Sequence, residues 1–143
     1  MKLDLLFAHC GDLGIEVEWA DLGDIRRGHY LDDTRTIVLN RRLTRAQLTT
    51  TLAHEVGHAV FGDRDTTPRL ERRASEYGAA LIITPRQYAA AERLVGHHLG
   101  ALAAELGVTP HLVEAWQRWA HRRLPLERRR RSGDWGGCVG DDS

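Results

Sequence analysis

Hydrophobic and polar residues follow two different periods along the chain. Apolar residues recur at helical spacing over residues 3–13 and again, on more than one face, over residues 44–62. Residues 15–19 alternate between apolar and polar positions, and residues 28–31 and 36–39 are short strand-like runs separated by a polar tetrapeptide. Alternation predicts a half-buried strand, and the polar tetrapeptide suits a hairpin connection. We therefore expect a mixed or antiparallel sheet of about three strands, packed on the helix over 44–62.

The ends of that helix carry their own signals. Thr44 and Gln47 have the spacing of a capping box, in which two side chains satisfy free amides of the first turn. Gly62 suits the C-terminus, and Asp63, Asp65 and Pro68 after it reinforce the stop. The apolar residues cover several faces, which indicates a helix packed on several sides. They are Leu48, Leu52, Ala53, Val56, Ala59 and Val60.

The remainder of the chain is predicted to be helical as far as residue 123. One helix covers residues 71–84 and is ended by Pro85, and others are expected over 86–94, 98–106 and 109–123. A small sheet followed by a helical C-terminal part makes the expected fold class α+β.

Composition indicates a single domain. The 143 residues are 42% hydrophobic and 28% charged, as is ordinary for a globular protein. We expect one domain over residues 1–124, with its core over 28–85 and a helical part over 86–124. Residues 125–143 are basic at first and then rich in Gly, Asp and Ser, which is typical of a disordered tail.

Charge and cysteine content narrow the class of protein. The net charge is zero, so no strong overall field recruits nucleic acid, although the chain is acidic up to Asp33 and basic after Trp116. Cys10 and Cys138 are too few and too far apart for a disulfide framework. No apolar stretch is long enough for a signal peptide or a membrane span. These features predict a cytoplasmic protein without membrane association.

The chemistry is concentrated in His54-Glu55-Val56-Gly57-His58. On a helix this H-E-x-x-H segment places both imidazoles one turn apart on one face, where they can bind the same metal ion. The intervening carboxylate then lies beside the open position of the metal. Unpaired polar groups in an apolar site cost several kcal/mol each, so burial of these side chains favours a bound ion. The motif predicts a zinc peptidase with Glu55 as general base.

A catalytic zinc ion takes three protein ligands, so a third must come from elsewhere. On the helix over 71–84, Glu71 shares a stripe with the small residues Ser75 and Gly78, which would let this helix approach the first closely. Glu71 is therefore the predicted third ligand. Glu76 lies about 140° around the helix beside two arginines and is interpreted as part of a solvated face. The other histidines lack ligand spacing: His9, His29, His97, His98, His111 and His121.

A peptidase also needs a hydrogen-bond donor for the oxyanion that develops at the cleaved carbonyl. Tyr30, Tyr77 and Thr51 are candidates. We give Tyr30 a slight preference because it lies in a strand-like run before the motif helix, but packing of its ring is an equal explanation.

These residues together resemble the ImmA/IrrE family of metallo-endopeptidases, over about residues 28–85 and more loosely to Trp116. The resemblance implies a small zincin-like domain in which His54, His58 and Glu71 bind zinc and Glu55 is the catalytic base. The matching positions are Gly28, Tyr30, Ile37, Leu39, Leu43, Gln47, 51–55, 57–58, Glu71, Ala74, Ser75, Tyr77, Ala79 and Pro85.

The resemblance also implies a partner. Family members are typically encoded beside a helix-turn-helix repressor and cleave it, which induces a prophage, a mobile element or a DNA-damage response. The sequence departs from the family pattern at Ser75, where many members carry Asn or Asp, and at Gly78, where Ala is usual. We expect the hydrogen bond that Asn or Asp would make beside the metal to be weaker with Ser75.

Other interpretations stay open. Residues 102–116 have the packing pattern of a helix-turn-helix unit. Arginines beyond it could contact phosphates, so DNA binding is a less favoured alternative; they are Arg118, Arg122, Arg123 and 128–131. The chain could thus be a non-catalytic antirepressor or DNA-binding regulator with a structural metal, or the toxin of a toxin-antitoxin pair. The residues predict neither the substrate sequence nor the oligomeric state.

Overall fold

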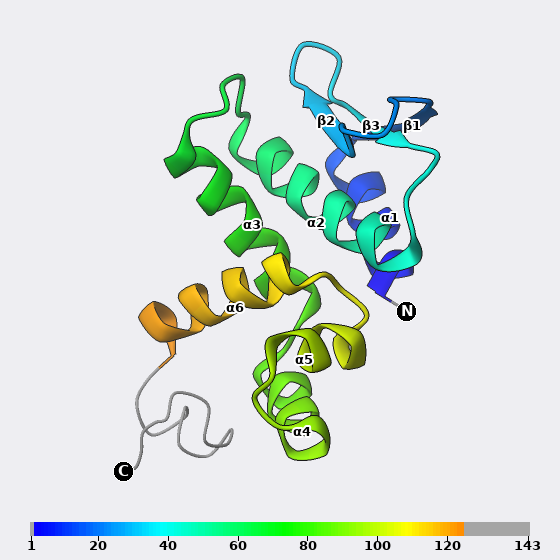
Figure 1. Ribbon diagram of the computed structural model, residues 1–143. Helices are drawn as coiled ribbons and strands as arrows, with labels where there is room; N and C mark the ends of the chain where they lie inside the picture. Colours follow the sequence, from blue (N-terminus) through cyan, green and yellow to red (C-terminus); the bar gives the residue numbers. More distant parts are fainter. Residues whose placement is uncertain (1, 125–143) are drawn as a thin grey trace.

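The computed structural model describes residues 2–124, so the predictions made for residues 125–143 lie outside it. A small sheet follows the first helix and precedes all the other helices, which is the α+β organisation expected (Figure 1). In chain order the elements are α1 (Lys2–Leu13), β1 (Glu16–Ala20), β2 (Gly28–Leu31), β3 (Thr36–Asn40), α2 (Arg45–Phe61), α3 (Pro68–Ile82), α4 (Pro85–Val95), α5 (Leu99–Leu106) and α6 (Pro110–Arg123).

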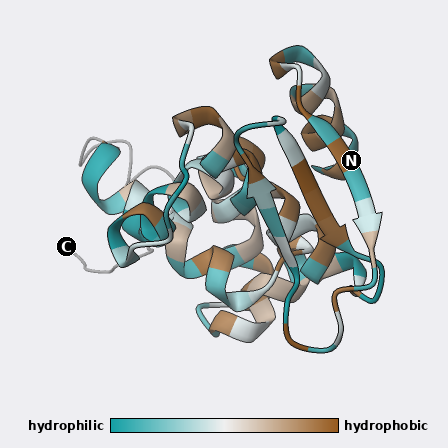
Figure 2. Cartoon of the chain, turned by 90° about the horizontal axis from the view of Figure 1, so that it is seen from above, coloured by the Kyte–Doolittle hydropathy of each residue, from teal (hydrophilic) through white to brown (hydrophobic). Residues whose placement is uncertain are grey.

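The sheet is mixed, with strand order β1-β3-β2. The central strand β3 pairs parallel with β1, where Val17 faces Ile37, and antiparallel with β2, where Tyr30 faces Ile37. Figure 2 shows this central strand as the most hydrophobic of the three, and four of its five residues are buried. The predicted hairpin over residues 28–39 is confirmed, and β2 is left with one unpaired edge.

The caps of α2 are those predicted. The Thr44 hydroxyl accepts from the Gln47 amide N–H, and the Gln47 side chain accepts from the Thr44 N–H in return. Gly62 adopts the left-handed conformation with φ 65° and donates its N–H to carbonyls of the last turn. Residues 49–59 are buried except His54. Val60, expected to pack, is 37% exposed because it lies near the end of the helix.

Helices α2 and α3 lie side by side (Figure 1) at a distance that only small residues permit. A Cβ on Gly78 would stand 2.4 Å from the Ala53 carbonyl oxygen, and a Cβ on Gly57 would stand 2.3 Å from the Ala74 carbonyl oxygen. The predicted stripe of small residues on α3 is thus confirmed, and Gly57 of the metal motif supplies its counterpart on α2. Close approach brings the chemistry of the two helices together.

Helix α3 begins at Pro68, three residues earlier than predicted. Pro68 was predicted to reinforce the stop after α2. The structure shows instead that the Thr67 hydroxyl accepts from the Leu70 N–H as an N-cap and that Pro68 occupies the first turn, where its missing N–H is not needed. The same pairing of Thr84 with Pro85 starts α4. Glu71 therefore lies in the first turn of α3.

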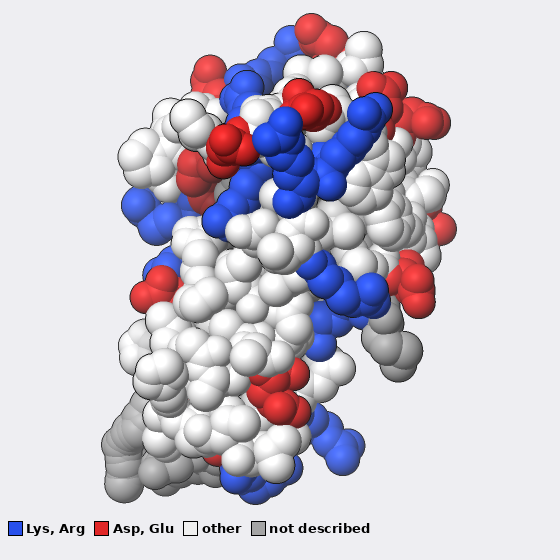
Figure 3. Space-filling model, turned by 45° about the vertical axis from the view of Figure 1, so that its right-hand side comes forward, with Lys and Arg blue, Asp and Glu red and all other residues white. Residues whose placement is uncertain are grey.

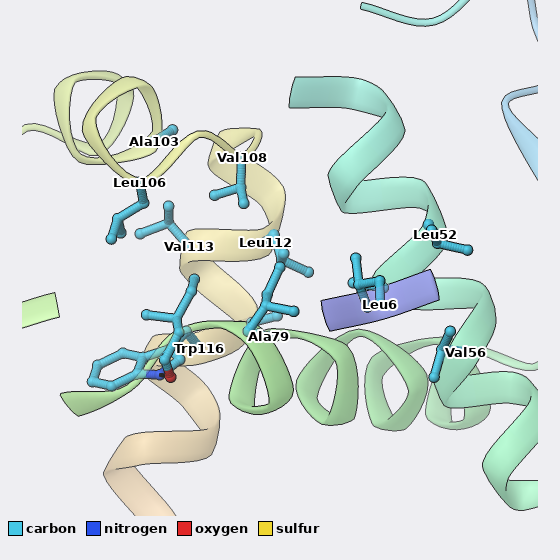
Figure 4. Packing of buried hydrophobic residues seen from close by; sticks show 14 of the residues in the cluster. Leu6, Leu52, Val56, Ala79, Ala103, Leu106, Val108, Leu112, Val113 and Trp116 are labelled. Atoms are coloured by element: carbon cyan, nitrogen blue, oxygen red, sulfur yellow. Dashed lines mark hydrogen bonds between the residues drawn. The ribbon is translucent and has the colours of Figure 1, made fainter. Parts of the chain in front are cut away.

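The C-terminal helices share one hydrophobic core with α2 and α1. Figure 4 follows it from Leu6 and Val56 to Val113 and Trp116. The Trp116 ring is fully buried, stacks on Tyr88 with ring centroids 4.2 Å apart, and donates its Nε1–H to the Ile83 carbonyl at 2.8 Å. These contacts join α6 to α4 and to the end of α3, and α6 also packs directly against α3. Among the described helices, none has the length and apolarity needed to cross a bilayer.

Candidate metal centre

Two helices bring three predicted ligands to one point. His54 and His58 lie one turn apart on α2, and Glu71 faces them from the first turn of α3. The Nε2 atoms of the histidines are 3.1 Å apart. Glu71 places Oε1 3.0 Å from His54 Nε2 and Oε2 2.8 Å from His58 Nε2. In the described part of the chain this is the one cluster of three or more His, Cys, Asp or Glu side chains whose ligand atoms could hold a metal ion.

The chemistry of this donor set fits a metal cation. Two ligands about 2.0–2.1 Å from a tetrahedral zinc ion are about 3.3 Å apart, close to the spacing of the two imidazole nitrogens. The buried Oε2 of Glu71 has no hydrogen-bond donor. His58 Nε2 lies 2.8 Å from it, and a neutral imidazole that donates from Nδ1 to the Asp63 carboxylate has only a lone pair on Nε2. Lone pairs of His58 Nε2 and of the Glu71 carboxylate therefore point at each other without a proton between them, and a cation bound there would stabilise them.

Each imidazole is held from behind through Nδ1. His58 Nδ1 donates to Asp63 Oδ2 at 2.9 Å, and Asp63 is held in turn by Arg73 at 2.8 Å. His54 Nδ1 lies 2.7 Å from the Ser75 hydroxyl. Such partners orient a ligating histidine and leave Nε2 for the metal. Ser75 therefore forms a hydrogen bond with His54 at the position where the sequence predicted a weaker bond than Asn or Asp would make.

Sequence reasoning assigned Asp63 only to the end of α2. Its carboxylate returns to the metal motif because Gly62 turns the chain back, and the Asp63 N–H bonds the His58 carbonyl at 2.9 Å. The sequence did contain a signal for this contact. Asp63 directly follows the glycine that ends α2 and is five positions after His58. His111, which had been set aside for its spacing, also reaches the centre, with Nε2 3.2 Å from the Ser75 hydroxyl.

Glu55 lies beside the cluster in a separate environment. Its side chain is almost fully buried, and burial is the main cause that raises its pKa to about 7. The charge of Glu71 raises this pKa further, whereas His58 and Arg26 lower it. A carboxyl group with a pKa near neutrality can both accept and release a proton at the pH of a cell.

A cleft of about 390 Å³ opens onto these groups. Residues 28–31 of β2 line this cleft together with Glu55, His58 and Glu71. The arrangement places the unpaired edge of the sheet next to the predicted metal ligands.

Of the three candidate oxyanion donors, Tyr30 lines this cleft. Its hydroxyl donates to Asp32 Oδ1 at 2.8 Å. Tyr77 lies elsewhere, with its hydroxyl 3.1 Å from His9 Nε2, and lines a second cavity beyond α3. Thr51 is buried within α2 and is not part of the cleft wall.

The interpretation of Glu76 as solvated was wrong. This carboxylate is only 8% exposed and forms ion pairs with Arg118 and Arg122 of α6, the first at 3.2 Å. Its helix neighbours suggested a charged surface, but α6 packs over that face of α3 and supplies the arginines from 42 and 46 residues away. Two of the arginines considered for phosphate contacts are thereby engaged within the fold.

Comparisons with known proteins identify a family and a similar fold. The model of a peptidase family described as IrrE N-terminal-like domain matches residues 10–115. A solved structure of a Mycobacterium tuberculosis transcriptional regulator is similar with a TM-score of 0.62 and 18% sequence identity, over 89% of this chain. At that identity the likeness shows the fold alone, and the match spans 43% of the regulator. Curated proteins yield no match.

Proposed function

This chain belongs to the IrrE N-terminal-like domain family of peptidases, and on that premise we propose that it is a zinc-dependent endopeptidase acting on a protein substrate. The observation that carries the proposal is the convergence of His54, His58 and Glu71 beside a buried Glu55, at the side of an open cleft.

His54 and His58 would hold the ion through Nε2, and Glu71 through its carboxylate. A zinc ion bound there supplies a Lewis acid that polarises the scissile carbonyl and makes a water molecule acidic near neutral pH. Catalytic zinc sites use three protein ligands, the number that the described residues supply here, whereas structural zinc sites use four. Asp63, which also lies beside His58, is engaged by His58 Nδ1 and Arg73.

Glu55 would handle the protons of the reaction. Its carboxylate accepts a proton from the attacking water and then delivers that proton to the leaving amine nitrogen, so that the two product peptides separate. Burial of Glu55 keeps its pKa close to the working pH and excludes bulk water that would compete for the same proton.

The edge of β2 is the proposed docking line for the substrate backbone. An extended peptide can add to an unpaired strand edge through main-chain hydrogen bonds, and residues 28–31 lie along the cleft. Tyr30 would donate its hydroxyl proton to the developing oxyanion, after exchanging its present bond to Asp32 for one to the substrate. The substrate segment must therefore be extended or locally unfolded.

The proposed substrate is a helix-turn-helix repressor encoded nearby, whose cleavage would switch a prophage, a mobile element or a stress response. The support is the resemblance of residues 28–85 to the ImmA/IrrE endopeptidases, whose members cut such repressors. We place the reaction in the cytoplasm, because a repressor acts there and because its reducing conditions suit the free thiol of Cys10.

Co-expression with the neighbouring repressor, followed by mass spectrometry of its fragments, tests the proposal. Glu55→Gln should retain zinc and lose hydrolysis by a factor of about a hundred or more, because the amide cannot take the proton. His54→Ala should lose the metal itself. Cleavage by Glu55→Gln at near wild-type rate would contradict the mechanism.

A non-catalytic regulator is the second candidate. It is favoured by the α5–α6 pair, joined at Gly107 like a helix-turn-helix, and by the name of the similar solved structure. Within residues 2–124 the cluster has three ligands rather than four, which argues against a structural metal. The engagement of Arg118 and Arg122 by Glu76 argues against phosphate contacts. A toxin that kills by the same hydrolysis would differ only in its substrate, so fragment analysis distinguishes it from a repressor protease.

A further inference from the structure

Helix α6 reaches the metal centre through one histidine that no role in the proposed reaction explains. His111 lies in the first turn of α6, and its Nε2 is 3.2 Å from the Ser75 hydroxyl oxygen. The same oxygen is 2.7 Å from His54 Nδ1. Ser75 is 1% exposed, so its hydroxyl is confined between the two imidazoles.

The hydrogens in this chain can run in only one direction when His54 binds a metal. A metal on Nε2 requires the proton of the neutral imidazole to be on Nδ1, and that N–H can only donate. The Ser75 oxygen must then accept from His54 Nδ1. A hydroxyl has a single hydrogen, and the neighbouring atom placed to accept it is His111 Nε2.

Without an acceptor at position 111, the Ser75 hydroxyl could turn. It could donate to the carbonyl four residues earlier in its own helix. It could also donate to His54 Nδ1, which would leave the proton of that imidazole on Nε2. The second arrangement favours the His54 tautomer that cannot bind a metal through Nε2. The Glu71 carboxylate, 3.0 Å from Nε2, would stabilise this tautomer by accepting the Nε2 hydrogen.

We propose that His111 is a positioning residue for the metal centre: it accepts the Ser75 hydroxyl hydrogen and thereby selects the His54 tautomer that presents Nε2 to zinc. The inference rests on zinc binding by this centre, as in the proposed function.

The test is the zinc affinity of the purified full chain, measured by competition with a chromogenic chelator. His111→Phe retains a ring of similar size and removes the acceptor, and it should weaken zinc binding about tenfold, within the range for partners of ligating histidines. His111→Gln restores an acceptor oxygen and should recover most of the affinity. Glu114→Ala, an exposed change on the same helix, is the matched control and should leave the affinity unchanged.

A double-mutant cycle separates this role from a general structural one. Because His111 acts through Ser75, His111→Phe should have little further effect in a Ser75→Ala background. Equal affinity of His111→Phe and wild type, or the same loss in both backgrounds, would overturn the inference. Failure of the wild-type chain to bind zinc would instead refute the proposed function, so the two failures are distinguishable. Thermal unfolding in EDTA verifies that each variant is folded.

Discussion

Contacts between helices determine whether a charged residue of this protein is buried or exposed. Glu76 is the clearest case, because a carboxylate that its own helix would leave in water is covered by α6 and paired with Arg118 and Arg122. Removal of the carboxylate leaves two guanidinium groups that must be satisfied by water alone. The arginine side chains are 36% and 53% exposed, so solvent relieves part of that loss.

We therefore expect Glu76→Ala to lower the free energy of unfolding by about 1–2 kcal/mol, the range for hydrogen bonds to charged groups after discounting for solvent. Urea unfolding in EDTA measures this without a contribution from metal binding. Glu105→Ala on the exposed side of α5 is the control and should change stability by no more than about 0.5 kcal/mol. Equal effects of the two changes would show that the α3–α6 ion pairs contribute nothing.

The burial of Cys10 predicts that its thiol reacts slowly in the folded protein. The thiol is 2% exposed, and burial raises its pKa to about 11. At pH 8 it remains protonated, and a thiol is a poor nucleophile compared with its thiolate. In a Cys138→Ser background, we expect a disulfide reagent to react with Cys10 only after denaturation. Rapid stoichiometric reaction of the folded chain would show that α1 opens readily.

At the scale of elements, the α2–α3 contact sets the geometry of the metal centre. The ligands come from both helices, so the separation of the helices decides whether the carboxylate of Glu71 reaches the two imidazoles. Gly57 and Gly78 permit that separation, since a Cβ at either position would overlap a backbone carbonyl of the facing helix. Backbone atoms cannot move aside as a flexible side chain can.

Gly78→Ala should therefore destabilise the protein by at least about 1–3 kcal/mol through overpacking, and should also weaken zinc binding by pushing α3 outward. Urea unfolding and zinc titration measure the two effects. Gly11→Ala is the matched control, since nothing lies within 4 Å of its added Cβ on α1, and should leave stability unchanged or raise it by up to about 1 kcal/mol. A neutral Gly78→Ala would mean that the helices can separate freely.

The whole molecule combines one core with a surface of mixed charge. The hydrophobic cluster runs from α1 to α6 without involving the ligands. On the face shown in Figure 3, acidic and basic side chains are interspersed rather than segregated, in keeping with a net charge of zero. Because the ligands lie outside this cluster, we expect the chain to fold without a metal.

We expect the metal-free protein to remain folded but to unfold at a lower temperature. Free zinc at a hundred times its dissociation constant adds about 2.7 kcal/mol to the stability of a protein that binds it only when folded. Circular dichroism with zinc and with EDTA should show this difference in the wild type and not in His58→Ala. Loss of helical signal in EDTA alone would instead identify the metal as part of the core.

Much of this protein could be predicted from short stretches of sequence, because those features depend on neighbours in the chain. The caps of α2, the hairpin of β2 with β3, and the imidazoles one turn apart are examples. These features depend on backbone hydrogen bonds and on the helical repeat, and both involve residues only a few positions apart. The small residues of α3 even indicated that it would lie close to α2.

Tertiary structure alone decided the partners of the charged and polar groups. The sequence alone could not show that Glu76 is buried, because α6 covers it only in the folded chain. It also could not show that Asp63 contacts His58 or that His111 contacts Ser75, because these contacts depend on the turn at Gly62 and on the packing of α6 across α3. Hydrogen bonds and ion pairs depend on distances of a few ångströms between residues that lie up to 46 positions apart in these cases. Local patterns of polarity carry no information about such distances, because they are set by how complete helices pack.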